Sequence, residues 1–90
     1  MAYHCRVGSY RFDGVTFRVY PEDHAPPHVH AQYQGVVAIL ELGQDRVARL
    51  TVRWDAIQPG DAKRNQVRHI VKVANAHFDE LKELWEEAHA

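Results

Sequence analysis

The chain has 90 residues, of which 46% are hydrophobic and 26% charged, and its formal net charge is −1. This length fits one domain, and the composition excludes a disordered or collagen-like chain. Cys5 is the single cysteine, so no internal disulfide forms, which suits a reducing compartment. Since the sequence lacks an apolar run of the ~18 residues that a membrane span needs, and also a signal-peptide pattern, we expect a soluble cytoplasmic protein.

The first predicted element is a hairpin. Residues 15–20 form one arm, because apolar and polar residues alternate there, and residues 10–12 are a candidate for the other arm, because Asp13-Gly14 is a common hairpin turn. The segment 21–27 is rich in proline, which cannot donate a hydrogen bond to a central strand ladder. We therefore expect a loop there.

Three further strands are predicted after this loop. Residues 28–33 alternate between apolar and polar side chains, and Gln34-Gly35 forms a tight turn into the next strand. Residues 36–42 are apolar at both parities, which is typical of a central strand. Residues 47–54 alternate again and form the last strand of the meander.

The C-terminal third predicts a helical segment over about residues 61–88, with Asp61 as the N-cap. Apolar residues step by three and four along it, at Val67, Val71, Ala74, Phe78, Leu81 and Trp85. One straight helix would be about 42 Å long at 1.5 Å per residue, so we expect a bend between Asn75 and Asp79, with one of these two residues capping the second half. The fold class is therefore α+β. A three- to four-stranded antiparallel meander, at about residues 9–54, is packed on one face by a long helix or a bent helix pair.

The sheet face opposite the helix is expected to carry the function. Its predicted side chains are Arg18, Tyr20, His28, His30, Gln32, Arg49, Thr51 and Arg53. His28 and His30 are two residues apart on a strand, so their side chains leave on the same side, with backbones about 6.5–7 Å apart. Two imidazoles so placed can converge on one zinc, nickel or iron ion. The third candidate ligand is His24, and the alternatives are Asp23, Glu22, His69 and His77.

Acid–base chemistry and a structural role are competing interpretations of the same segment. Histidine titrates near ~6.5, so two imidazoles beside an arginine resemble the groups that metal-free RNA cleavage needs. The catalytic candidates are His24, His28, His30, Tyr20 and Arg18. In the structural interpretation, Asp23 and His24 bond the loop backbone, and the strand histidines bind no ligand.

Charge is segregated along the chain. Basic residues dominate from Arg46 to Lys72, and acidic residues dominate from Asp79 to Glu87. Such asymmetry fits an anionic partner or two solvated faces of opposite sign. RNA or DNA would be contacted through Arg49, Arg53, Arg64 and Arg68.

The run RVYPEDHAPPHVHAQY, residues 18–33, resembles the R-M-Y-x-x-D-H-x-P-P-H-x-H-A-x-Y signature of a small bacterial family, domain of unknown function family 4160 (DUF4160). The resemblance extends to an H-x-x-E-L-x-x-x-W pattern that ends at Trp85, and covers most of residues 9–88. Val29 departs from the phenylalanine that is common at this position in the family.

The resemblance implies a small cytoplasmic α+β domain, often encoded beside a second small domain in an arrangement suggested to be a toxin–antitoxin pair. We therefore expect an interaction or regulatory module that contacts a protein encoded nearby through the His-rich loop and the basic sheet face. The alternative is a small hydrolase or ribonuclease that uses His24, His28 and His30, with or without a divalent metal such as zinc. Exposed sheet edges and a thin helix layer also favour a homodimer.

Overall fold

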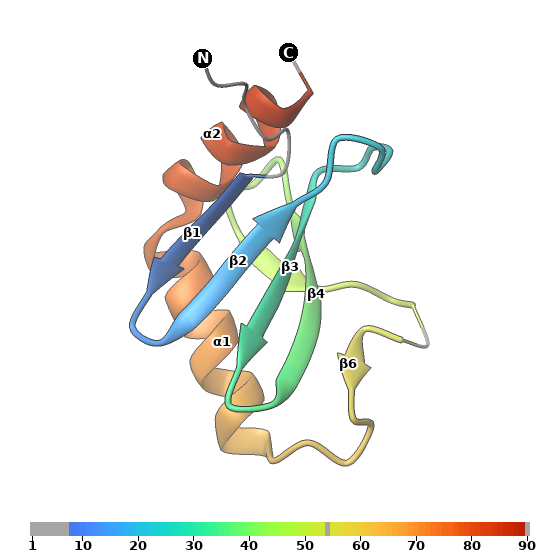
Figure 1. The fold of residues 1–90 in the computed structure, drawn as a ribbon, viewed down its shortest axis with the longest axis vertical. Helices are drawn as coiled ribbons and strands as arrows, with labels where there is room; N and C mark the ends of the chain where they lie inside the picture. Colours follow the sequence, from blue (N-terminus) through green and yellow to red (C-terminus); the bar gives the residue numbers. More distant parts are fainter. Residues whose placement is uncertain (1–7, 54, 90) are drawn as a thin grey trace, which may run out of the picture.

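The computed structural model describes residues 8–53 and 55–89 (Figure 1), so Cys5 and Trp54 lie outside the described residues. The elements in chain order are β1 (Gly8–Phe12), β2 (Val15–Val19), β3 (His28–Tyr33), β4 (Val36–Leu42), β5 (Ala48–Leu50), β6 (Ile57–Gln58), α1 (Arg64–Ala76) and α2 (Phe78–Ala88). All strand pairs are antiparallel, and β1 to β5 are neighbours in sequence order while β6 pairs with β4. The predicted α+β meander is confirmed, with six strands rather than three to four.

Two hairpins build most of the sheet, and each depends on a two-residue turn. Asp13 and Gly14 have φ values of 50° and 83°, and Gln34 and Gly35 have values of 49° and 82°. Positive φ at both central residues defines a type I′ turn, whose twist matches that of the flanking strands. Both turns were predicted from the sequence, and they fix the registers of β1 with β2 and of β3 with β4.

Strand β4 is central, as predicted, because it pairs with three other strands. Its first half pairs with β6 and its second half with β5. The prediction of one strand over residues 47–54 is wrong, since β5 ends at Leu50 and Val52 is fully exposed. Ile39 lies between these two halves of β4. Its backbone N–H donates to the carbonyl of Ala56, and its carbonyl accepts the backbone N–H of Thr51. The chain therefore leaves the sheet after Thr51 and pairs with β4 again at β6.

Helices α1 and α2 lie along one face of the sheet and bury its apolar side chains (Figure 1). The fully buried members of this core include Phe17, Val29, Leu40, Ile70 and Leu81. Helix α1 has 13 residues and α2 has 11, and neither described helix is long and apolar enough to cross a membrane. Parity along the strands thus sends one set of side chains to the helices and leaves the alternate set on the outer face.

The predicted bend in the helical segment is confirmed at His77, between α1 and α2. The predicted caps are wrong. Helix α1 has Lys63 at its N-cap position, two residues after Asp61, because Asp61 lies in the turn that Ala62 closes by bonding Pro59. Neither Asn75 nor Asp79 caps α2: the Asn75 amide bonds both backbone groups of Ala48 in β5, and Asp79 pairs with Arg46 at 2.7 Å.

Candidate functional site

The site begins with the loop at residues 21–27, which is bonded to both α2 and β4. The two ring nitrogens of His89 each lie 2.8 Å from a carbonyl oxygen, Nδ1 from that of Trp85 and Nε2 from that of Asp23. At the other end of the loop, the Pro27 carbonyl accepts the backbone N–H of Leu42 at 2.9 Å. These bonds hold the backbone of Asp23 beside the start of β3.

His28 and His30 project from β3 on the outer face, since the intervening Val29 is buried in the core. Their ring centroids lie 5.4 Å apart, and the side chains are 13% and 26% exposed. Both rings turn Nε2 toward the same carboxylate oxygen, Asp23 Oδ2, at 3.2 Å for His28 and 3.1 Å for His30. One ligand atom from each of the three residues lies within 4.8 Å of the others, so they form one cluster, called the Asp23 cluster below.

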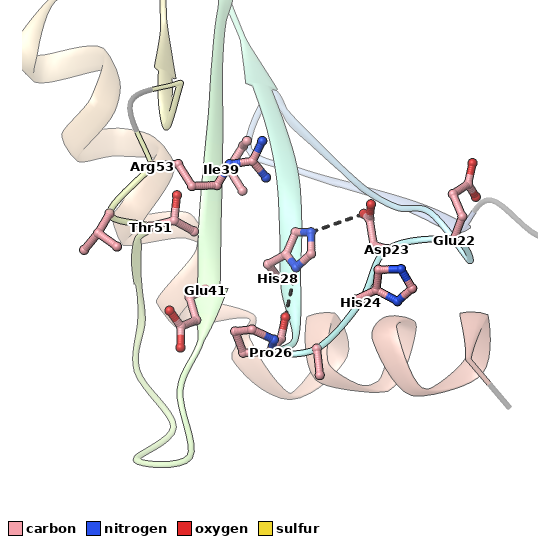
Figure 2. A pocket seen from close by; sticks show the side chains of 11 residues that line it. Glu22, Asp23, His24, Pro26, His28, Ile39, Glu41, Thr51 and Arg53 are labelled. Atoms are coloured by element: carbon pink, nitrogen blue, oxygen red, sulfur yellow. Dashed lines mark hydrogen bonds and ion pairs between the residues drawn. The ribbon is translucent and has the colours of Figure 1, made fainter.

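Aromatic and backbone contacts orient the two rings. The edge of Tyr20 meets His30 at 5.0 Å between centroids, and Trp85 of α2 contacts His28 at 5.3 Å. The His28 Nδ1 lies 2.9 Å from the Pro26 carbonyl (Figure 2). Because a carbonyl oxygen only accepts hydrogen bonds, His28 carries a proton on Nδ1 and directs Nε2 at Asp23.

A groove of about 440 Å³ opens on the outer face beside the cluster. Figure 2 shows its two sides, one from the loop and the other from β4 and the segment after β5. The lining residues are Glu22, Asp23, His24, Ala25, Pro26, His28, Ile39, Glu41, Thr51, Val52 and Arg53. Thr51 Oγ1 is buried and has no hydrogen-bond partner among the described residues. The groove is therefore lined by acidic side chains and by a threonine whose hydroxyl is buried.

The arginines proposed to contact anions are not gathered around the groove. Arg49 pairs with Asp45 at 2.8 Å, and the bonds from this guanidinium lower the pKa of Asp45 below its ordinary value. Arg53 lines the groove but donates two bonds of 2.9 Å to Asp55. Arg64 and Arg68 lie exposed on α1, in the helix layer.

Arg18, the arginine among the catalytic candidates, lies opposite His30 on β2. Its guanidinium is 3.4 Å from the side-chain oxygen of Gln32. Arg18 therefore flanks the cluster on the outer face, on the β2 side of His30.

The structure brings together only some of the predicted ligands. Asp23 takes the third position that the sequence assigned first to His24, which lies exposed on the rim of the groove. His69 bonds the carbonyl of Asp13 at 3.0 Å, and His77 stacks on Phe12 at 3.7 Å, so the helix histidines lie outside the cluster. Sequence reasoning missed the role of His89 because no spacing pattern links a residue at the end of a helix to a loop far earlier in the chain.

Comparison with protein families identifies one to which the chain is similar. The model of the family described as "Domain of unknown function (DUF4160)" matches residues 14–86, which is most of the chain and includes the loop, β3 and nearly all of α2. The searches of curated proteins and of solved structures each gave no match.

Proposed function

The chain belongs to the DUF4160 family, and we propose that it is a small interaction or regulatory module, one component of a two-gene, toxin–antitoxin-like system. Its contact site is the groove beside the Asp23 cluster, and its partner is the protein encoded by the neighbouring gene. The observation that carries this proposal is the groove itself, which is formed by two segments distant in sequence on the face that the helices leave open.

The size and lining of the groove suit recognition of a protein side chain or short segment. Ligand pockets commonly measure ~300–1,000 Å³ and combine apolar surface with a few polar groups, and this groove lies within that range. Ile39 and the fully exposed Val52 supply apolar surface. Glu22 and Glu41 supply acceptors, which favours a partner that inserts a lysine, an arginine or another donor.

The second candidate function is a small hydrolase or ribonuclease that uses His24, His28 and His30. Convergence of two imidazoles and a carboxylate within 4.8 Å favours it. Metal-free cleavage of RNA also needs a cation that stabilises the charge developing on the phosphate. Arg53, which lines the groove, is paired with Asp55, and Arg18 flanks the cluster beside His30 but does not line the groove. Cleavage would therefore depend on Arg18 as the cation, whereas the binding function needs no cation at the groove.

The experiment is to co-express the chain with the product of the neighbouring gene and to measure the dissociation constant by calorimetry. Reversing the charge of a groove acid, Glu41→Lys, should weaken the complex at least tenfold. Glu83→Lys, on the exposed side of α2, is the matched control and should leave the affinity unchanged. An affinity that Glu41→Lys leaves unchanged would contradict the proposed contact site.

A parallel assay separates the two candidate functions. The purified chain is incubated with RNA, and cleavage is compared among the native protein, His28→Ala and His30→Ala. The binding function predicts no cleavage by any of them. Cleavage by the native chain that both substitutions abolish would establish the hydrolase in its place.

A further inference from the structure

We propose that the Asp23 cluster is a binding site for one divalent transition metal of the zinc class, with Asp23 Oδ2 and the Nε2 atoms of His28 and His30 as ligands. This inference goes beyond the contact site proposed above, because it holds whether or not a partner occupies the groove. It also assigns the third ligand to Asp23, the residue that the two rings face in common.

The spacing of the ligand atoms is the first argument. Zinc bonds nitrogen and oxygen at about 2.0–2.2 Å, so two ligand atoms on one ion lie about 2.9–3.5 Å apart at octahedral or tetrahedral angles. The distances from Asp23 Oδ2 to the two Nε2 atoms are 3.2 and 3.1 Å. Two of the three separations therefore already suit one shared ion, and the ligand atoms of the two rings lie within 4.8 Å of each other.

The orientation of the His28 ring is the second argument. Metal-bound histidines commonly bond a backbone carbonyl through the ring nitrogen that does not face the ion. The Nδ1 of His28 lies 2.9 Å from the Pro26 carbonyl, and its Nε2 faces Asp23 Oδ2 at 3.2 Å. The ring therefore already turns Nε2 toward the position of the proposed ion.

The donor set decides the class of metal. Two imidazoles and one carboxylate suit zinc, iron, nickel or copper, whereas calcium and magnesium prefer oxygen donors alone. Three protein ligands leave at least one coordination position for another group. Asp23 and His28 both line the groove, so that position is available to a group that enters there.

The surroundings hold the ligands in place before a metal arrives. Trp85 packs against His28 and Tyr20 against His30, while His89 bonds the backbone of Asp23. The three side chains are between 13% and 26% exposed, so an ion can enter from solvent without rearrangement of the core. A rigid first set of ligands with outer-shell partners is the arrangement that metal sites require.

The test uses untagged full-length protein stripped with a chelator. Zinc binding is measured by calorimetry, and cobalt binding by visible absorption. We expect one ion per chain. Asp23→Asn and His30→Gln should each weaken zinc binding by on the order of 100-fold or more, because each removes a direct ligand. His24→Gln, in the same loop but outside the cluster, is the matched control and should change the affinity less than threefold.

Two further measurements keep the result interpretable. Thermal melting of each metal-free variant should match the metal-free native protein within a few degrees, which separates loss of a ligand from loss of the fold. The cobalt spectrum should lack a thiolate charge-transfer band, and Cys5→Ser should bind normally, which excludes Cys5 as a ligand.

Absence of a one-to-one zinc complex, equal affinity in Asp23→Asn and the native chain, or loss of binding in Cys5→Ser would each overturn the inference. The partner-binding assay with Glu41→Lys is repeated in the presence of chelator. It tests the proposed contact site separately from the metal site. If no metal binds but Glu41→Lys still weakens the complex, the metal inference fails and the contact site stands.

Discussion

Asn75 links helix α1 to strand β5, and its removal is expected to destabilise the fold by a measurable amount. Its side-chain oxygen accepts the backbone N–H of Ala48, and its nitrogen donates to the carbonyls of Ala48 and Val71, all at 2.9 Å. Ala48 is 1% exposed, so Asn75→Ala leaves a buried N–H and a buried C=O of β5 without these partners.

An orphaned buried polar group costs about 1–3 kcal/mol. Because Asn75 itself lies at an exposed position, water reaches part of the vacated space, and we take about 1 kcal/mol for each of the two groups. A loss of about 2 kcal/mol corresponds to a decrease of about 8–16 °C in the Tm of a domain of this size. The higher helix propensity of alanine offsets about 0.5 kcal/mol of this loss, so the expected net loss is about 1.5 kcal/mol and the expected decrease in Tm is about 6–12 °C.

The assay is thermal and urea unfolding followed by circular dichroism on the purified chain. Asn65→Ala is the matched control, because Asn65 lies exposed on the same helix and no described contact of its side chain is lost; its Tm should stay within a few degrees of the native value. If Asn75→Ala changes Tm no more than Asn65→Ala does, the link between α1 and β5 contributes nothing, and the reasoning is refuted.

Three further predictions concern the loop, an ion pair and a turn. His89→Ala removes the bond to the carbonyl of Asp23. Loss of an outer-shell partner commonly weakens metal binding, so zinc affinity measured by calorimetry should fall about 10–100-fold. An unchanged affinity would show that zinc binding does not depend on this contact of the loop. Arg49 lowers the pKa of Asp45, so the ionised carboxylate stabilises the fold above the ordinary carboxyl pKa, and this contribution disappears as the pH falls through the lowered pKa. Asp45→Asn should therefore reduce Tm slightly at pH 7 and leave it unchanged at pH 2; an equal reduction at both pH values would rule out the ionic cause. Gly35→Ala places a side chain at φ 82°, with no atom within 4 Å of the new Cβ. The free energy of unfolding measured in urea should therefore fall by about 1–2 kcal/mol, from backbone strain alone. An unchanged free energy of unfolding would contradict the type I′ assignment.

Local patterns predicted the fold where short-range chemistry decides the structure. Asp13-Gly14 and Gln34-Gly35 both form the expected turns, because few residue pairs tolerate two successive positive φ values. The prediction of one strand over residues 47–54 failed because the alternation of apolar residues does not report the exit of the chain from the sheet after Thr51. The N-cap assignment failed for a similar reason, since a turn closed by Pro59 delays the start of α1.

The candidate site was predictable from the sequence only in part. Strand parity placed His28 and His30 on one face, and the structure has them there. The loop conformation beside the end of α2 decides that Asp23, and not His24, is the third residue of the cluster. The sequence of two adjacent polar residues does not reveal this conformation. The pairing of Arg49 with Asp45 and of Arg53 with Asp55 likewise follows from the turns between strands, which composition does not describe.

The central claim is that two imidazole rings and one carboxylate form a single unit on the outer face. Long-range ¹H–¹⁵N correlation spectra of the histidine side chains test it directly in the metal-free chain, with and without Asp23→Asn. The account predicts that the substitution shifts the Nε2 resonances of both His28 and His30, leaves those of His69 unchanged, and preserves the proton on His28 Nδ1. Spectra in which neither ring responds, or only one does, would contradict it.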